Sequence, residues 1–320
     1  MAEVVARWIG QDGAVGTRSG ATFEPCPDGS AWGWIDVTAP DDEVLSALAA
    51  HYDLHSLAIE DVRHAQARPK LDAYASGLFL AWLTPVVNGN GNIISEELDV
   101  FIGSTYLVTL HAAANGVIDA IATDLEHSMR RGPDWLLHAI VDRLVDRTLP
   151  LVDTVGERLG AIEDAMLEDN PRQQELRNLH MVRRQLVRLH RIVAPERDIL
   201  RGFARESDAI SEDAYRYFQD VGDHVARALD SIETYQDVGA SVMDVYLSAQ
   251  NNRMNAIMKQ LTVVATIFMP LTLISGIYGM NVVVGMWPPI SEIWSFPVVV
   301  GSMVVIALVM ALYFRKKQWW

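Results

Sequence analysis

The end of the chain carries two long apolar runs. The first is LTVVATIFMPLTLISGIYGMN at residues 261–281, and its 17 residues from 261 to 277 include no charged side chain. The second is FPVVVGSMVVIALVMALYF, the 19 uncharged residues 296–314. An α-helix needs roughly 20 mainly apolar residues to cross about 30 Å of hydrocarbon, with a range of about 17–25. The sequence therefore predicts two membrane spans behind about 255 residues of water-soluble chain.

Basic residues flank these spans on one side only. Arg253 and Lys259 precede the first span and residues 315–317 follow the second, whereas the linker 281–295 has Glu292 as its only charged side chain. Lys and Arg are retained on the cytoplasmic side of a membrane. We therefore expect a multi-pass protein of the cell (inner or plasma) membrane, with both termini in the cytoplasm and the linker outside.

Composition excludes several classes of protein. The 320 residues carry a formal net charge of −15 and a single cysteine, Cys26. One cysteine rules out an intrachain disulfide, a CxxC redox pair and a cysteine-based zinc site, and we expect a free cytosolic thiol. The negative charge argues against nucleic acid as a partner, because binding to phosphates needs a basic face. It is compatible with cation handling and equally with a soluble acidic surface.

Residues 1–130 have the pattern of a mixed α/β domain. Short apolar or β-rich runs bounded by turn residues predict strands at residues 31–37, 78–83 and 106–110. Residues 43–51 predict a helix, and the Asn- and Gly-rich segment 88–92 predicts a turn between two strands.

From Pro133 onward the pattern becomes helical. Apolar residues recur at helical spacing in residues 135–168 and 173–203, which predicts two amphipathic helices that pair as an antiparallel hairpin. A third helical pattern begins near Glu212 and continues to Pro270, inside the first span. Its roughly 65 residues would extend about 100 Å. A helix that long, with no partner of its own length, suggests a stalk packed against copies of itself.

One face of this third helix, the polar stripe, changes from acidic to amide and then to small, hydroxylic or Met side chains. Its members recur every three, four or seven residues: Asp223, Asp230, Asp237, Asp244, Ser248, Asn251, Asn255, Met258, Thr262, Ala265, Met269, Thr272, Gly276 and Gly279. Small residues in a span often pack against another helix, and acids at this spacing often form a solvated face. We favour a pore lining, because the stripe is continuous through the bilayer and ends at Asn281, where a ring of amide oxygens could select an ion. One helix cannot enclose a pore, but a ring of identical chains can, with the first spans inside.

The end of the first span carries a family resemblance. The segment IFMPLTLISGIYGMN, residues 267–281, closely resembles the signature of the CorA magnesium transport family, two-span proteins with a Gly-Met-Asn motif. The resemblance covers the chain in outline, including IEDV at 59–62, RPKLD at 68–72 and the basic-aromatic tail 313–320. It implies an α+β/α membrane protein that forms a funnel-shaped homopentamer. The implied parts are a cytoplasmic α/β domain (1–130), a cytoplasmic long-helix stalk (131–255), a pore-lining transmembrane helix (256–280), an extracytoplasmic loop (281–295), a second transmembrane helix (296–314) and a basic cytoplasmic tail (315–320).

The resemblance also implies roles for single residues. The positions that match the outer ion entrance, or selectivity filter, are Gly279, Met280 and Asn281, with Asn281 as the selecting residue. The positions that match the pore lining are Thr272, Met269, Leu261, Met258 and Asn255, with Asp244 as an acidic ring further along. Leu261 rests on the resemblance alone, because it lies off the polar stripe. Asp61 and Asp220 match carboxylates that regulatory cytoplasmic Mg²⁺ bridges between neighbouring subunits.

The resemblance thus implies a channel or transporter that admits Mg²⁺, and also Co²⁺ and Ni²⁺, down the electrochemical gradient and that cytoplasmic Mg²⁺ closes. Mg²⁺ is expected as transported and regulatory ion, with no organic cofactor. The expected partners are other copies of the chain, divalent ions and membrane lipid. Mg²⁺ loses water slowly, so an amide ring can hydrogen-bond its waters without replacing them. Rings of Met258 and Leu261 would form apolar constrictions that gate by dewetting.

Other functions remain as alternatives. A related one is a Zn²⁺ transporter of the ZntB type, with or without proton coupling. The intact Met280 and the lack of soft ligands in the polar stripe favour Mg²⁺. The linker departs from the family pattern, since Val282 follows the motif where many members have Phe, and any outer acidic ring must come from Glu292.

More distant classes are disfavoured. A non-conducting membrane scaffold or sensor does not explain the polar stripe. An enzyme is not expected, because the sequence contains no nucleophile–base constellation and no phosphate-binding loop. The nine histidines show no paired spacing in the pore helix and are interpreted as structural.

Overall fold

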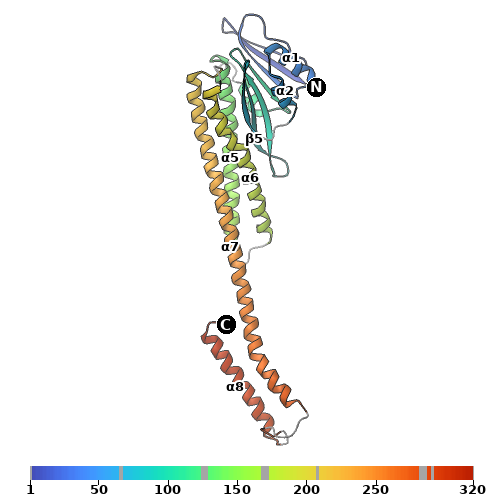
Figure 1. The fold of residues 1–320 in the computed structure, drawn as a ribbon, viewed down its shortest axis with the longest axis vertical. Helices are drawn as coiled ribbons and strands as arrows, with labels where there is room; N and C mark the ends of the chain where they lie inside the picture. Colours follow the sequence, from blue (N-terminus) through green and yellow to red (C-terminus); the bar gives the residue numbers. More distant parts are fainter. Residues whose placement is uncertain are drawn as a thin grey trace. The chain divides into compact units, whose positions relative to one another are not determined.

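The computed structural model divides into two compact units, Met1–Val242 and Met243–Trp320. It describes residues 2–64, 68–123, 129–166, 173–206, 209–280, 287–289 and 292–319. Figure 1 shows the elements coloured in the order of the sequence.

The first unit is built on one seven-stranded sheet. The strands lie in the order β2-β1-β3-β7-β6-β5-β4. Neighbouring strands are antiparallel except β3 and β7, which run parallel and join the three N-terminal strands to the later four. The strands are β1 Glu3–Gly10, β2 Val15–Gly20, β3 Ser30–Thr38, β4 Lys70–Tyr74, β5 Gly77–Val87, β6 Ile93–Ile102 and β7 Tyr106–His111.

Helices α1 (Asp42–Tyr52) and α2 (Ser56–Arg63) cover one face of the sheet. Asp41 begins α1, because its carboxylate accepts a hydrogen bond from the Val44 N–H at 3.0 Å. Alternate strand residues point to this face and form a core with the helices. The core includes Ile35, Val37, Phe79, Phe101, Val108 and Leu110 from the strands and Val44, Leu45, Leu48 and Ile59 from the helices.

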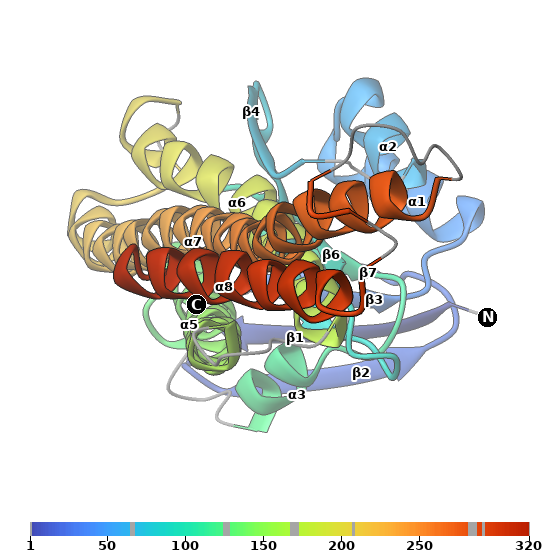
Figure 2. The same ribbon diagram turned by 90° about the horizontal axis from the view of Figure 1, so that it is seen from below.

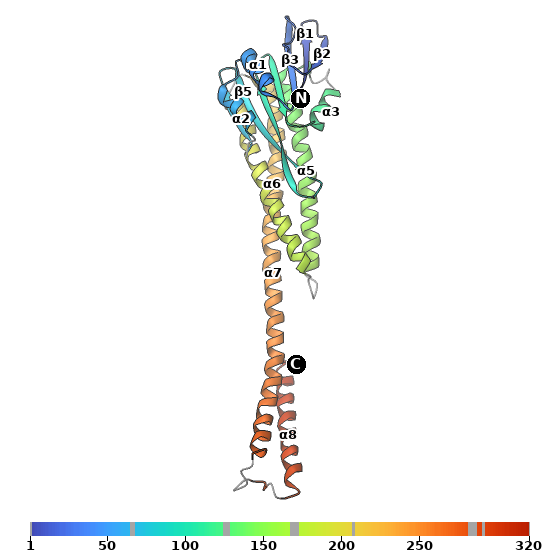
Figure 3. The same ribbon diagram turned by 90° about the vertical axis from the view of Figure 1, so that its right-hand side faces the viewer.

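Long helices cover the opposite face. They are α5 (Pro133–Met166) and α6 (Gln173–Glu206), which contact each other and the sheet, with α3 (Gly116–Thr123) against α5. Figure 3 shows α5 and α6 as an antiparallel pair. Trp34 and Trp82 alternate toward this face and are fully buried. The predicted helical hairpin is therefore confirmed.

The predicted elements of the N-terminal region are also confirmed. The three predicted strands lie within β3, β5 and β7, and the predicted helix lies within α1. The predicted turn joins β5 to β6, where the Asn88 N–H donates to the Asn92 carbonyl at 2.9 Å.

Helix α7, Glu212–Tyr278, is a single helix of 67 residues, as its pattern predicts, and it continues through Pro270. In the first unit it packs against the helical hairpin: the Phe218 ring lies 4.7 Å from the ring of Phe203, centroid to centroid. Gly156 on α5 permits this approach, because a Cβ there would lie 2.3 Å from the ring of Tyr235 on α7.

The second unit is a hairpin of the last part of α7 and α8 (Ser295–Lys316), which lie side by side in Figures 1, 2 and 3. Both helices contain a stretch long and apolar enough to cross a membrane, with mean hydropathies of 1.9 and 2.4. Only 6% of each stretch is buried. Apolar surface of this extent favours lipid or other protein chains over water.

Candidate ion pathway and metal-binding residues

The predicted pore residues lie on the part of the hairpin surface that α8 leaves open. Between residues 251 and 280, the side chains that are not fully exposed are Val263, Ile267, Pro270, Leu271, Ile274 and Tyr278. These recur every three or four residues and form the face of α7 toward α8. The polar stripe occupies a different face, and each of its members from Asp244 to Gly279 is exposed. A single chain therefore leaves the stripe from Ala265 to Gly279 free to line a shared pathway, whereas Asn255, Met258 and Thr262 border a cavity that Gln318 and Trp319 also line.

Each predicted pore-lining residue that the structure describes is solvent-accessible. Met258 is 54% exposed, Leu261 62% and Met269 73%, values high for apolar side chains. Asn255, Thr272 and Asp244 are also exposed. Asp244 lies at the start of the second unit, outside the apolar stretch. The structure thus brings these side chains onto one helix, and their arrangement around a ring stays a prediction.

The two threonine hydroxyls of the stripe are satisfied within α7. Thr262 Oγ1 donates to the Met258 carbonyl at 2.8 Å, and Thr272 Oγ1 donates to the Phe268 carbonyl at 2.9 Å. Each hydroxyl proton is used inside the helix, so the oxygen presents its lone pairs outward. Such oxygens can accept hydrogen bonds from the water shell of a cation.

Helix α7 ends where the selectivity-filter motif begins. The Gly279 N–H donates to the Ser275 carbonyl at 2.9 Å and the Met280 N–H to the Ile277 carbonyl at 3.2 Å, which tightens the last turn. The Tyr278 hydroxyl donates to the Trp287 carbonyl at 2.8 Å and ties the helix end to the linker. Gly279 and Met280 are exposed, whereas Asn281 lies outside the described residues.

Asp61, a predicted regulatory residue, already has a cationic partner. The Lys70 ammonium donates hydrogen bonds to the carboxylates of Asp61 and Asp72, the latter at 2.9 Å. Burial lowers the pKa of Lys70, but the hydrogen bonds and charges of Asp61 and Asp72 outweigh it, and the pKa is raised overall. These groups and Glu60 border a cavity of about 510 Å³. A metal ion at Asp61 would have to displace or share this Lys70 contact.

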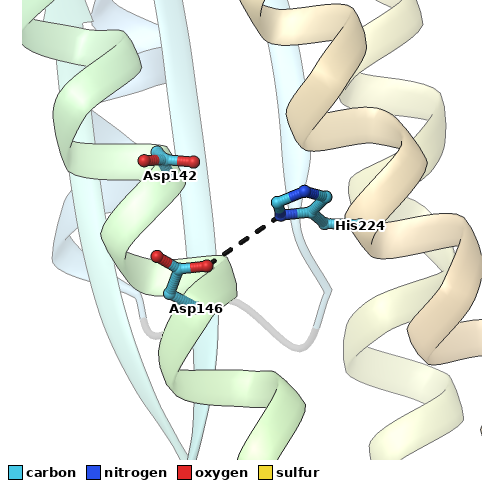
Figure 4. Close-up of side chains that lie close together, drawn as sticks. All are labelled: Asp142, Asp146 and His224. Atoms are coloured by element: carbon cyan, nitrogen blue, oxygen red, sulfur yellow. Dashed lines mark ion pairs between the residues drawn. The ribbon is translucent and has the colours of Figure 1, made fainter.

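A group of two carboxylates and one imidazole lies between α5 and α7 (Figure 4). The possible ligand atoms of Asp142, Asp146 and His224 all lie within 4.8 Å of one another. His224 Nδ1 is 3.9 Å from Asp146 Oδ1 and is buried without a hydrogen-bond partner among the described residues. Carboxylate and imidazole together suit Zn²⁺ and other transition metals, whereas Mg²⁺ prefers oxygen alone. We refer to these three residues as the Asp-Asp-His cluster.

Asp220, the second predicted regulatory residue, adjoins this cluster. It is exposed on α7, one turn before His224. Burial lowers the pKa of His138, and the charges of Asp142 and Asp220 oppose that shift. Asp220 and Asp142 therefore act on the same imidazole. The interpretation of the histidines as structural stays a prediction; the sequence signal for this group is the acid pair Asp142 and Asp146, at four-residue spacing on α5.

The architecture has close parallels in known proteins. A family model described as CorA-like Mg²⁺ transporter protein matches residues 29–316. The chain belongs to this family. The cobalt/magnesium transport protein CorA of Thermotoga maritima is 31% identical over 302 residues, which cover 92% of this chain and 85% of the relative.

Other similarities extend the comparison. The zinc transport protein ZntB of Pectobacterium carotovorum is 26% identical over 254 residues, 75% of each chain. The solved structure of the CorA magnesium transporter from Methanocaldococcus jannaschii matches with a TM-score of 0.81 at 24% identity, over 99% of this chain and 98% of that one, which shows a common fold. The chain is thus a membrane transporter of divalent metals of the CorA family, and not an enzyme. Its α+β/α fold is the predicted one.

Proposed function

We propose that five copies of this chain surround a pore that conducts Mg²⁺, and also Co²⁺ and Ni²⁺, into the cytoplasm. The α7 helices line the pore, and the α8 helices surround them. The observation that carries this proposal is the polar stripe on α7, which is exposed on a face that α8 does not cover. A ring of chains would bring the stripes together around one axis and would leave the apolar faces to lipid.

The chemistry of the stripe suits a hydrated cation. Residues 245–280 contain no carboxylate, so the pathway inside the membrane offers amide, hydroxyl and thioether groups only. Mg²⁺ dehydrates reluctantly, and uncharged oxygens can hold its waters without trapping the ion. The acids of α7 beyond the membrane, Asp244 among them, would raise the local cation concentration. A membrane potential of about 100 mV contributes roughly 4.6 kcal/mol for a divalent ion, which drives entry without ATP.

Closure by cytoplasmic Mg²⁺ is the regulatory part of the proposal. Mg²⁺ would bridge Asp61 of one subunit and Asp220 of its neighbour, and loss of the ion would leave like charges that push the subunits apart. Two features support this. Asp61 borders a cavity with Glu60, Asp72 and Lys70, and Asp220 is exposed on α7 one turn before His224. In this proposal both termini lie in the cytoplasm, since the basic residues beside the spans do.

A Zn²⁺ transporter is the second candidate. The similarity to ZntB supports it, and so does the imidazole of His224, which is a better ligand for Zn²⁺ than for Mg²⁺. Against it, the polar stripe contains no histidine or cysteine.

Flux into liposomes separates these functions. Purified protein would be reconstituted, and influx of Mg²⁺, Co²⁺ and Zn²⁺ followed with and without a pH gradient and internal Mg²⁺. The proposal expects Mg²⁺ influx that is indifferent to pH, is closed by internal Mg²⁺ and is lost in Asn281→Ala. Zn²⁺ influx that requires the proton gradient would favour the second candidate. Unchanged influx in Asn281→Ala would contradict the assigned filter.

A further inference from the structure

A large cavity lies where α8 ends against α7. Its volume is about 770 Å³, and both walls belong to the second unit. Its lining side chains are Asn252, Asn255, Ala256, Met258, Lys259, Gln260, Thr262, Gln318 and Trp319, of which Asn255, Met258 and Thr262 also belong to the polar stripe. Lys259 lies four residues before the buried Val263, on the face of α7 toward α8. The cavity therefore continues the seam between the two helices beyond the end of α8.

The chain turns sharply after α8 and forms the second wall. The Gln318 N–H donates to the Arg315 carbonyl and the Trp319 N–H to the Phe314 carbonyl, each at 3.1 Å, and Gln318 has a left-handed φ of 57°. This turn places the Trp319 ring 5.7 Å from the ring of Phe314, which is buried. Trp319 is thereby held at the cavity by backbone hydrogen bonds and by ring packing.

The cavity lies at the boundary between the apolar stretches and the polar part of the chain. Lys259 is two residues before the first uncharged run, and Arg315 directly follows the second. A side chain at this level reaches the headgroups of a bilayer, and a long Lys stem can extend to them. Trp is enriched at the same level, where its ring meets apolar chains and its N–H meets water.

The charge around the cavity is opposite in sign to that of the whole chain. The protein has a formal net charge of −15, yet after Asp244 its only acidic side chain is Glu292. All five basic side chains of the same segment are at the cavity end of the hairpin: Arg253, Lys259, Arg315, Lys316 and Lys317. Glu292 is in the linker at the other end. An anion at the cavity therefore meets positive charge with no competing side-chain carboxylate from this segment.

We propose that this cavity binds the headgroup of an anionic phospholipid. Lys259 supplies charge to the phosphate, the amides of Asn252, Gln260 and Gln318 donate hydrogen bonds to its oxygens, and Trp319 packs beside the glycerol and upper acyl chain. Basic clusters next to spans attract anionic headgroups by charge, and a fitted cavity with amide donors adds a fixed site to that attraction. The bound lipid would hold the tail against α7. This inference goes beyond the proposed function, since it holds whichever ion is transported.

Quenching of Trp319 by brominated lipid tests the site. Full-length protein would be placed in phosphatidylcholine nanodiscs that contain an equal minor fraction of either brominated phosphatidylglycerol or brominated phosphatidylcholine. Because the chain has nine tryptophans, the signal of Trp319 is the difference between wild type and Trp319→Phe. We expect this signal to be quenched more strongly by the brominated phosphatidylglycerol.

Substitutions at the cavity supply the second part of the test. The preference for phosphatidylglycerol is the ratio of Trp319 quenching by brominated phosphatidylglycerol to that by brominated phosphatidylcholine. Lys259→Gln, measured with and without Trp319→Phe, should lower this preference by about fivefold, whereas Lys259→Arg should retain it. Glu292→Gln, at the other end of the hairpin, should leave it unchanged. Equal quenching of the Trp319 signal by the two brominated lipids would overturn the proposal. A preference that survives Lys259→Gln would also overturn the proposal, because the anionic lipid would then be attracted by the basic residues in general and not by this cavity.

Discussion

The Lys70 ammonium on β4 donates a hydrogen bond to the Asp61 carboxylate on α2. A residue expected to hold a regulatory ion is thus already paired with a cation of its own chain. Both side chains are 28% exposed, so water screens the pair only in part. Closure by Mg²⁺ at Asp61 would then be a competition between the ion and Lys70, with a threshold that depends on how strongly Lys70 is held.

Removal of Lys70 should make the transporter more sensitive to internal Mg²⁺. In Lys70→Gln the Asp61 carboxylate loses its competing cation, and the Mg²⁺ concentration for half-maximal closure should fall roughly two- to fivefold, since a partly exposed ion pair contributes about 1 kcal/mol or less. Influx into liposomes at a series of internal Mg²⁺ concentrations measures this. Arg63→Gln is the matched control, because Arg63 is on the same helix and pairs with Asp42 at 2.8 Å. A threshold that is unchanged or higher in Lys70→Gln would contradict the role of Asp61.

The Asp-Asp-His cluster should bind transition metals. His224→Ala should weaken Co²⁺ or Zn²⁺ binding by about tenfold or more, since even loss of an outer-shell partner costs about 10–100-fold. Binding of Mg²⁺ should change less, because Mg²⁺ prefers oxygen ligands. Titration calorimetry of the purified protein measures both. His190→Ala is the control, because His190 is a more exposed histidine, 3.7 Å from Glu233. Equal Co²⁺ affinity in the two variants would exclude the cluster as a site.

Asp99 should make the fold less stable as the pH rises. Burial raises the pKa of Asp99 to about 8, with smaller contributions from the charges of Glu97 and Asp61 and an opposing one from Lys70. Its Oδ1 is buried without a hydrogen-bond partner among the described residues. The carboxyl of Asp99 ionises near pH ~4 in the unfolded state and near pH ~8 in the folded state. Between these values the folded protein keeps a proton that the unfolded protein has lost, so the free energy of unfolding falls by up to about 1.4 kcal/mol per pH unit.

The replacement Asp99→Asn removes that cost. Its Tm should match that of wild type near pH 4, exceed it increasingly up to about pH 8 and then stay ahead by a constant margin. Thermal unfolding in detergent across this range tests the shape of the curve, with Glu96→Gln on the exposed side of β6 as the control. A difference that does not grow with pH would show that Asp99 ionises normally in the folded protein.

The sequence predicts the parts of the fold that have a strong local period. The predicted helices match α5, α6 and α7 closely, because their apolar residues repeat over many turns. It does not predict β2, whose sequence VGTRSG is mostly exposed and has no apolar–polar alternation. The parallel pairing of β3 with β7 is also hidden, since Gly33 and Tyr106 become neighbours only through the tertiary fold.

The candidate sites likewise divide into those that a local sequence pattern predicts and those that depend on tertiary contacts. The polar stripe lies on one helix, so its spacing alone places Asn255, Met269 and Thr272 on a common face. The Asp-Asp-His cluster joins α5 to α7, and nothing in the spacing of His224 from Asp142 shows that contact. The Lys70–Asp61 pair likewise depends on how α2 packs against the sheet edge.

Cysteine substitution along α7 tests the central claim, that the polar stripe lines the pore. Cys26 is the only native cysteine, so Cys26→Ala gives a background without thiols. Thr272→Cys and Leu273→Cys then place a thiol on the stripe or one residue off it, at positions that are both exposed in a single chain. Met269→Cys and Phe268→Cys form a second such pair, for use if a Thr272 variant is inactive.

The measurement is inhibition of Mg²⁺ influx by Cd²⁺, a soft divalent ion that binds thiolates. We expect that Cd²⁺ inhibits Thr272→Cys strongly, that a thiol chelator reverses this inhibition, and that Leu273→Cys resembles the cysteine-free background. Stronger inhibition of Leu273→Cys, or no inhibition of either stripe position, would contradict a pore lined by this face of α7.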